Sequence, residues 1–277
     1  MMGALEFLYG TAAGRLLLKP LVSRPVSRLC GRFLDTGLSK VLIGPFARRA
    51  GIDLSECELD DIHCFNDFFC RPLKPGRREI AHEPWALMAP CDGLLTAVPV
   101  TDGLVLPVKQ SRYTAERLLG DAALAEKFEG GLCLVYRLRV DHYHRYCYFD
   151  SGMKGENVFL PGVLHTVQPV ALADIPVFTE NCREYTVLET EHFGRAVQME
   201  VGAMLVGRIV NGHPGPRRVT RGEEKGHFAY GGSTIIVLLQ KDAAILRPDI
   251  LAASAAGTEI PVKMGEAVGT AAEKYEK

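Results

Sequence analysis

The spacing of apolar residues changes along the chain. In the first 50 residues, apolar side chains recur every three or four positions with arginines and lysines between them, which predicts amphipathic helices. From residue 86 onward, short segments rich in β-branched residues are separated by glycines and prolines, which predicts β-strands. The expected fold class is therefore α+β: amino-terminal amphipathic helices over residues 1–60, then a mainly antiparallel β barrel or sandwich over residues 61–277.

The clearest strand is the apolar run 234–239, which directly follows Gly231, Gly232 and Ser233. Because this run is β-branched and almost wholly apolar, we expect a buried strand with Ser233 at a tight turn before it. One helix is expected over residues 113–128. The other expected strands are 94–98, 131–140, 163–167, 185–189, 198–201 and 203–210, with a strand, turn and strand over 259–269.

Composition is that of a globular protein, since 47% of the 277 residues are hydrophobic and 23% are charged. A net charge of −1 gives no reason to expect a nucleic-acid partner. The eight cysteines form no C-x-x-C pair and no secretory signal is recognised, so we expect reduced thiols in a cytoplasmic protein.

The first 50 residues are strongly basic. They carry eight lysines and arginines against two acidic residues, a net charge of 8 − 2 = +6. No apolar run here approaches the roughly 20 residues of a membrane-spanning helix. Basic amphipathic helices of this kind either lie on an anionic membrane surface or pack on the rest of the domain, and the pattern leaves both open.

The Gly-Gly-Ser sequence before the buried strand is a candidate for self-cleavage. The Ser233 hydroxyl lies next to the carbonyl of Gly232, which glycine leaves open to close approach, and it can attack this carbonyl and shift the acyl group from nitrogen to oxygen. The resulting ester can undergo β-elimination to dehydroalanine, which hydrolyses to an amino-terminal pyruvoyl group. The same residues also suit an ordinary turn before a strand.

Two histidines follow the expected strand 131–140. On a continuous strand His142 and His144 would share one face. Such a pair can bind one metal ion, or one imidazole can act as a base toward Ser233, or the two can be a solvated polar strand end. Asp92 precedes a glycine between two apolar segments, which is usual for a turn carboxylate.

Five stretches, taken together and in this order, resemble the phosphatidylserine decarboxylase family. The resemblance covers roughly residues 5–270. The family's usual Leu-Gly-Ser-Thr is Gly-Gly-Ser-Thr here, which keeps the glycine and serine on either side of the processed bond. The five stretches are 65–73 (FNDFFCRPL), 89–93 (APCDG), 143–145 (YHR), 178–184 (FTENCRE) running on to 201–203 (VGA), and 221–226 (RGEEKG) leading to 232–234 (GST).

The resemblance implies a self-processing enzyme. Ser233 would attack Gly232, cleave the chain and become a covalent pyruvoyl group, the cofactor of the family. The products would be a β chain, residues 1–232, and an α chain, residues 233–277, which stay associated. The implied activity is decarboxylation of phosphatidylserine to phosphatidylethanolamine through a Schiff base with the pyruvoyl group, with no external cofactor and no metal.

Site residues also follow from the resemblance. Asp92 looks like the carboxylate of the family's charge-relay set, and the Tyr-His-Arg motif places His144 beside it. Many members have a second histidine three residues after the first, where this chain has Cys147. We therefore expect His144 to serve both self-cleavage and decarboxylation, with His142 as the alternative contributor.

Partners and location are implied in the same way. The phospholipid substrate must be taken from a bilayer, which gives the basic amino-terminal helices a use at a membrane surface. We expect a peripheral protein on the cytoplasmic side of the cell membrane, and a homo-oligomer of the cleaved unit is one option. The family's β core resembles a barrel-sandwich hybrid.

Two other functions compete with this interpretation. A cupin-type metal enzyme would use His142, His144 and a third ligand such as His165 or Glu189. A non-enzymatic carrier would use Lys263, since Val-Lys-Met-Gly at 262–265 resembles a biotinyl or lipoyl turn without the usual flanking methionine.

Overall fold

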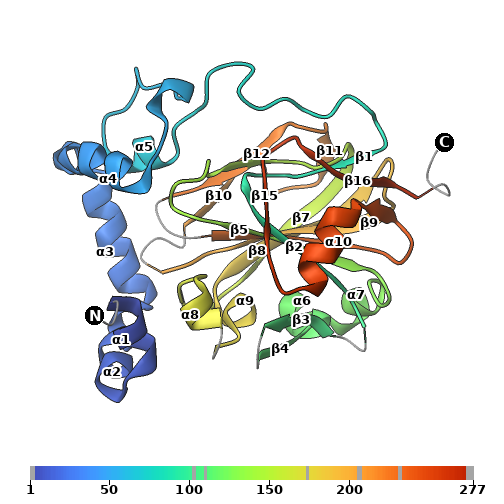
Figure 1. The fold of residues 1–277 in the computed structure, drawn as a ribbon, viewed down its shortest axis with the longest axis horizontal. Helices are drawn as coiled ribbons and strands as arrows, with labels where there is room; N and C mark the ends of the chain where they lie inside the picture. Colours follow the sequence, from blue (N-terminus) through green and yellow to red (C-terminus); the bar gives the residue numbers. More distant parts are fainter. Residues whose placement is uncertain are drawn as a thin grey trace.

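The computed structural model describes residues 4–101, 104–108, 111–172, 175–204, 208–229 and 233–272. Its amino-terminal part is helical, as predicted, and forms a column along one side of a β-rich core (Figure 1). The helices are α1 (Ala4–Gly10), α2 (Ala12–Leu21), α3 (Arg24–Leu34), the 3-10 helix η1 (Gly37–Leu42) and α4 (Ile43–Ala50). Described helices include none that is long and apolar enough to span a membrane.

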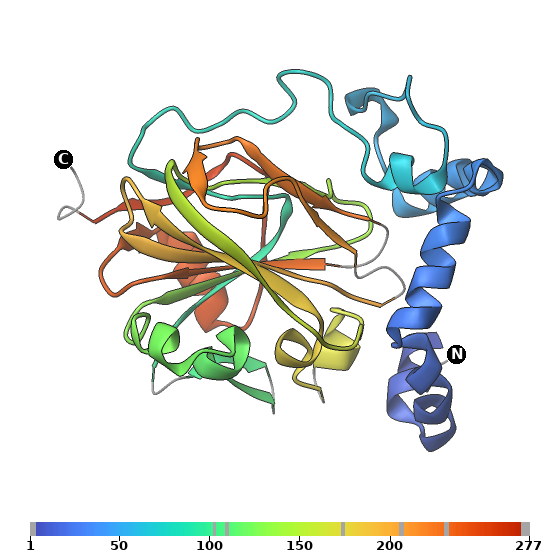
Figure 2. The same ribbon diagram turned by 180° about the vertical axis from the view of Figure 1, so that it is seen from behind.

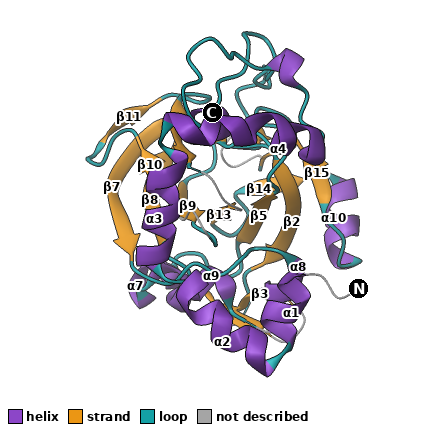
Figure 3. Cartoon of the chain, turned by 90° about the vertical axis from the view of Figure 1, so that its left-hand side faces the viewer, coloured by secondary structure: helices purple, strands orange, loops and turns teal. Residues whose placement is uncertain are grey.

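Specific contacts hold this column against the core. The Tyr9 hydroxyl accepts a hydrogen bond from the Thr166 amide at 3.1 Å, and the Leu164 amide donates to the Val22 carbonyl at 3.0 Å. Seen from the side of the helices, α2 and α3 stand in front of the sheet (Figure 3). The helices therefore pack on the domain through one face, while other faces remain exposed to solvent.

Residues 51–85 connect the helices to the core. This segment contains the 3-10 helix η2 (Leu54–Glu56) and α5 (Phe65–Phe69), and it then runs as an extended loop across the top of the core (Figure 2). The aromatic side chains of α5 are almost fully buried. Phe65 and Phe69 pack with Leu34 of α3 and with Ala229, so α5 joins the helical column to the core.

The core is built on one eight-stranded antiparallel sheet. From one edge to the other, its strands are β11 (Arg217–Val219), β7 (Gly152–Leu160), β8 (Arg183–Thr190), β9 (Arg195–Val201), β13 (Ser233–Leu239), β5 (Leu132–Leu138), β2 (Gly93–Pro99) and β15 (Ile260–Val262). Strand β13 lies near the middle. Ile235 and Val237 face one hydrophobic cluster and Ile236 and Leu238 face the other, which explains a continuous apolar run.

Smaller elements cover the two faces of this sheet. There are three smaller sheets among the described residues. One contains β1 (Ala86–Met88), β16 (Ala267–Ala271) and β14 (Ala244–Leu246), and another contains β10 (Ile209–Asn211), β12 (Glu224–Phe228) and β6 (Arg145–Cys147). The third pairs β3 (Leu104–Val108) with β4 (Ser111–Thr114). The remaining helices are α6 (Ala115–Leu119), α7 (Ala122–Glu126), α8 (Pro169–Leu172), α9 (Val177–Glu180) and α10 (Pro248–Ala255).

The fold class is α+β with antiparallel sheets, as predicted. Within the described residues, β11 and β15 each pair on one side only, so the large sheet is open and not closed into a barrel. The finer expectation of a barrel-sandwich hybrid stays a prediction.

Several expected elements differ. The single helix over 113–128 is wrong, because Gly120 in a left-handed conformation ends α6 and Asp121 caps α7. The strand over 163–167 is only an isolated bridge at Val163. In the segment 203–210 only the end of the range lies in a strand, and residues 205–207 lie outside the described part.

The histidine pair is also placed differently. His142 and His144 do not share a strand face, because β5 ends at Leu138 and β6 begins at Arg145. The two residues lie in the turn between these strands.

Candidate active site

Three strand ends meet where the large sheet approaches the helical column. Ser233, the first residue of β13, lies opposite Leu138 at the end of β5. On the other side of β5, Leu94 pairs with Arg137, so β2 begins at the same end of the sheet with Asp92 directly before it. The turn that carries His142 and His144 continues from β5. The register therefore brings all the predicted catalytic residues to one end of the sheet.

Ser233 is a buried residue with 1% of its surface exposed. Its Oγ has no hydrogen-bond partner among the described residues. A buried hydroxyl without a partner is costly, so such a group is often retained for chemistry. Gly232, the other side of the expected cleavage site, lies outside the described residues, together with Tyr230 and Gly231.

The chain just before this segment is held at three points. The Phe228 amide donates to the His144 carbonyl at 2.9 Å, the Cys70 thiol donates to the Phe228 carbonyl at 3.2 Å, and the Ala229 amide donates to the Arg208 carbonyl at 3.1 Å. The first of these bonds ties the backbone of His144 to the strand that leads toward Ser233. These bonds fix the backbone as far as Ala229.

His144 is completely buried, and its ring lies 4.0 Å from the ring of Phe69 between centroids. Its Nδ1 is 2.9 Å from the carbonyl oxygen of His142. Because a carbonyl can only accept, Nδ1 carries the proton and Nε2 of the neutral ring keeps a free lone pair. Nε2 has no partner among the described residues. Burial, assisted by the positive charge of Arg71, lowers the pKa of His144 to about 3, so the ring is neutral at physiological pH.

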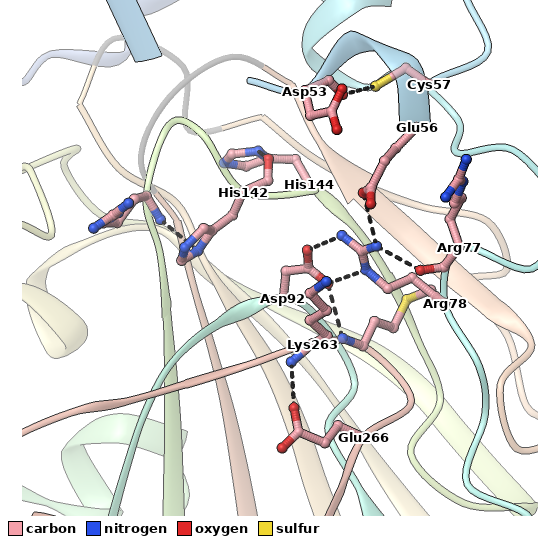
Figure 4. A network of polar contacts seen from close by, with 12 residues as sticks. Asp53, Glu56, Cys57, Arg77, Arg78, Asp92, His142, His144, Lys263 and Glu266 are labelled. Carbon is pink, nitrogen blue, oxygen red and sulfur yellow. Dashed lines mark hydrogen bonds and ion pairs between the residues drawn. The ribbon is translucent and has the colours of Figure 1, made fainter. Parts of the chain in front are cut away.

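Asp92 is paired with Arg78 and not with His144, which corrects the expected charge-relay contact (Figure 4). The guanidinium donates to both carboxylate oxygens, at 2.7 and 2.5 Å, and the Met264 amide donates to Oδ1 at 2.9 Å. Bidentate pairing fixes the carboxylate firmly. The ion pair with Arg78 neutralises the Asp92 carboxylate locally, and both side chains are largely buried.

His142 is the histidine on which Asp92 acts electrostatically. Burial lowers the pKa of His142, and the charges of Asp141 and Asp92 partly oppose this effect. Its Nδ1 accepts a hydrogen bond from the Arg139 amide at 3.2 Å. Its hydrogen-bonded nitrogen is therefore Nδ1, and His142 is part of the same polar region as Asp92.

Sequence reasoning missed two features of the site. Arg78 carries no motif signal, because it follows a Pro-Gly break in the connecting segment. Lys225 belongs to a motif, but its buried partner Glu200, at 2.5 Å, lies on another strand and could not be inferred. The neighbouring Gly226 is required by space, since a Cβ there would lie 2.1 Å from the Val210 carbonyl oxygen.

The two competing functions lose their structural support. His165 contacts Tyr9 and Glu180, and Glu189 pairs with Arg195, so neither joins His142 and His144. The described residues contain no group of three His, Cys, Asp or Glu side chains that could hold a metal ion.

The strand, turn and strand expected over 259–269 are present as β15 and β16. The two strands do not pair with each other as a carrier hairpin would, because β15 pairs with β2 whereas β16 pairs with β1 and β14. Gly265 has a φ of 88°, and a Cβ there would lie 2.3 Å from the Glu79 carbonyl oxygen. The glycine of the Val-Lys-Met-Gly turn is thus required for packing beside Arg78.

Known proteins resemble this chain over nearly its whole length. A family model described as phosphatidylserine decarboxylase matches residues 65–270. Phosphatidylserine decarboxylase proenzyme 2 of Clostridium acetobutylicum is 41% identical over 268 residues, which cover 96% of this chain and 91% of that protein. The phosphatidylserine decarboxylase proenzyme of Ruminiclostridium cellulolyticum is 39% identical, covering 99% and 93%, and that of Clostridium perfringens is 37% identical, covering 94% and 90%.

The α+β fold and the buried serine at the start of a central strand thus occur in a chain whose relatives are decarboxylating lyases made as proenzymes. The chain belongs to the phosphatidylserine decarboxylase family.

Proposed function

We propose that this protein decarboxylates phosphatidylserine to phosphatidylethanolamine with a pyruvoyl group that it makes from its own Ser233. The observation that carries the proposal is the buried, unpartnered hydroxyl of Ser233 at the first position of β13 in a member of this family. A pyruvoyl group in this position would replace that hydroxyl, and β13 would hold it between β5 and β9.

Self-cleavage needs only the chain and water. Ser233 Oγ loses its proton and attacks the carbonyl carbon of Gly232; the C–N bond breaks as the C–O bond forms, and the freed amine takes a proton. Removal of the Cα proton of residue 233 then breaks its Cβ–Oγ bond. This elimination leaves Gly232 with a carboxylate and residue 233 as dehydroalanine. Its imine tautomer takes up water and releases ammonia to give the pyruvoyl group.

His144 Nε2 is our candidate for the proton acceptor. It is the basic nitrogen of a neutral imidazole whose other nitrogen is fixed on the His142 carbonyl. The low pKa of His144 keeps this nitrogen free at working pH, although it also makes the ring a weaker base. Asp92 is then a positioning residue that fixes Arg78 and the turn at Met264 beside the histidine turn.

The pyruvoyl group supplies a ketone that condenses with an amine and draws electrons from the bond to the departing carboxylate. The protein's own contribution is a site buried from water and an imidazole that can return a proton to the product carbon. The α and β chains remain together in this proposal, and the homo-oligomer stays an untested expectation.

We also propose that the protein acts as a peripheral protein on the cytoplasmic side of the cell membrane. The support is the apolar surface of the helical column. Leu29 is 68% exposed and Phe33 51% exposed on α3, and Leu38 is 77% exposed on η1. Together with the +6 charge of the first 50 residues (8 − 2), this surface suits an anionic bilayer.

Intact mass under denaturing conditions tests the core of the proposal. We expect the wild type to give two chains, the smaller of 45 residues (277 − 232), with an amino terminus that reacts with carbonyl reagents. Ser233→Ala should remain one chain and release no carbon dioxide from phosphatidylserine vesicles. The matched control, Ser254→Ala, removes a serine hydroxyl elsewhere in the small chain and should be cleaved normally. A Ser233→Ala protein that is cleaved, or a wild type that produces no phosphatidylethanolamine, would refute the proposal.

A further inference from the structure

A cavity of about 430 Å³ lies between α3 and the β core. One wall is α3, and the opposite wall includes Phe159, Ile209 and Ala229. Ala229 is four residues before Ser233, so the cavity ends no more than about 14 Å along the chain from the proposed reactive residue. The cavity therefore ends within this chain length of residue 233, and none of the predicted catalytic residues lines it.

Arginines dominate the lining of this cavity. Arg24, Arg28 and Arg32 follow one another at four-residue intervals on a single face of α3, and Arg208 lines the cavity from the core. Arg208 lies 3.8 Å from Asp35, the one carboxylate of the lining. For the three arginines of α3, the described parts of the chain provide no ion pair; Arg24 instead lies over the ring of Phe159 at 5.4 Å.

Like charges four residues apart on a helix destabilise it, and here three are stacked in a row. In a surface helix such arginines would point to water and the apolar residues would face the core. In α3 the arginines line the cavity and still reach solvent, since Arg28 and Arg32 are exposed and Arg24 is half-buried, and Leu29 and Phe33 are exposed as well. An anion bound in the cavity would relieve the repulsion, and Arg guanidinium groups suit phosphate oxygens because of their planar donor geometry.

A second cavity, of about 710 Å³, also reaches Ala229, but its lining differs in charge. It includes Glu58, Asp60, Asp61 and Asp67 beside Arg145 and Arg208, so carboxylates outnumber arginines there. These carboxylates would repel an anion, so the arginine-lined cavity is the one suited to phosphate.

We propose that the cavity lined by Arg24, Arg28 and Arg32 binds the phosphate group of the phospholipid substrate. This inference rests on the proposed function and adds the residues that recognise the head group. With the phosphate held here, the amine is directed toward residue 233, and the acyl chains leave along the exposed apolar side of α3.

The test uses the full-length, self-cleaved protein and a short-chain phosphatidylserine below its micelle concentration, so that attraction to a bilayer does not enter the measurement. Variants Arg24→Gln, Arg28→Gln and Arg32→Gln are compared with Arg117→Gln, which removes an exposed arginine of α6 outside the cavity. Intact mass verifies that each variant is cleaved as the wild type is. We expect KM to rise about tenfold or more for each cavity variant, with kcat changed by less than about threefold, and no change for Arg117→Gln.

Inhibition distinguishes a lipid phosphate from free phosphate. Glycerol 3-phosphate should inhibit the wild type competitively, and the cavity variants should lose this inhibition. Inorganic phosphate that binds without competing with the lipid would identify a free-phosphate site and overturn the inference, as would cavity variants with unchanged KM. If the wild type decarboxylates no phosphatidylserine at all, the proposed function fails instead; glycerol 3-phosphate binding measured by calorimetry still decides whether the cavity takes a phosphate ester.

Discussion

At the residue scale, the protonation state of His144 follows from one hydrogen bond. The His142 carbonyl requires a proton on Nδ1, and burial prevents a second proton on Nε2. This arrangement gives a base without the help of a carboxylate, because Asp92 is already engaged by Arg78. Cys147 stands where the resemblance implies a second histidine. Its thiol is buried and donates toward the Pro90 carbonyl, and burial raises the pKa of this thiol.

The base can be tested with a variant that preserves the hydrogen bond. His144→Asn retains an amide donor for the His142 carbonyl but removes Nε2, and it should accumulate uncleaved chain, with a rate loss of about 10³ to 10⁴. His142→Ala and Cys147→Ala should be cleaved at near-normal rates. Gel analysis of the two chains over time measures this. Rapid cleavage of His144→Asn combined with a stalled His142→Ala would assign the base to His142.

Asp92→Asn should also slow cleavage, through loss of positioning. If loss of positioning is the cause, Arg78→Met, which breaks the same ion pair from the other side, should slow cleavage to a similar degree. If Arg78→Met is cleaved at the normal rate while Asp92→Asn is not cleaved, the carboxylate takes part directly in the chemistry.

The low pKa of His144 also predicts a pH dependence of stability. The unfolded chain binds a proton on this histidine below about pH 6.5, whereas the folded chain does so only near pH 3. The unfolded state therefore holds more protons between these values, and stability falls as the pH is lowered through this window. In a Ser233→Ala background, which keeps one chain, the free energy of unfolding in urea should fall by about 2 kcal/mol from pH 7 to pH 5 through His144 alone. The same drop in a protein that also carries His144→Asn would show that other groups cause it.

At the scale of elements, α3 presents two different faces. The arginine face lines a cavity, and the face with Leu29 and Phe33 remains exposed. Deleting the whole segment would remove core contacts such as those of Tyr9 and Leu34, so point substitutions give a cleaner test of membrane binding.

Leu29→Gln and Phe33→Gln should each weaken binding to anionic vesicles by roughly tenfold or more, because each removes an apolar side chain from the proposed bilayer contact. Added salt should weaken binding of the wild type. The control Ile245→Gln alters a side chain that is 58% exposed on β14 and should bind as the wild type does. Vesicle co-sedimentation measures the binding of the three variants and of the wild type with and without added salt. Equal binding of Leu29→Gln, Phe33→Gln and the wild type would contradict membrane docking through α3.

The elements that could be predicted from the sequence are those with strong local signals. The amino-terminal helices follow their apolar spacing, and β13 follows its apolar run. The division at Gly120 could have been seen from the glycine followed by Asp121, a good helix cap. The partners of Asp92 and the direction of His144 could not, because they depend on Arg78 and on contacts of His144 with Phe69 and Phe228, which are distant in sequence.

At the scale of the whole molecule, the expected cleavage point would place neighbouring strands of one sheet on different chains. Residues 233–272 of the small chain supply β13, β14, α10, β15 and β16, and the four strands are distributed over two sheets. Strand β13 pairs with β5 on one side and β9 on the other, so its hydrogen bonds link the small chain to the large chain along both edges. Strand β15 adds to β2, and β16 adds to β1.

This topology predicts that the cleaved chains separate only when the protein unfolds. The five residues Ile235 to Leu239 are each at most 1% exposed, and burying one such side chain contributes about 1.5–3 kcal/mol. Native mass spectrometry and size-exclusion chromatography of the cleaved protein should therefore give one species containing both chains, and the small chain should appear only in denaturant. The denaturant concentration that releases it should coincide with the loss of tertiary structure followed by near-ultraviolet circular dichroism. Release of the small chain in native buffer, before any loss of that signal, would contradict the central position of β13.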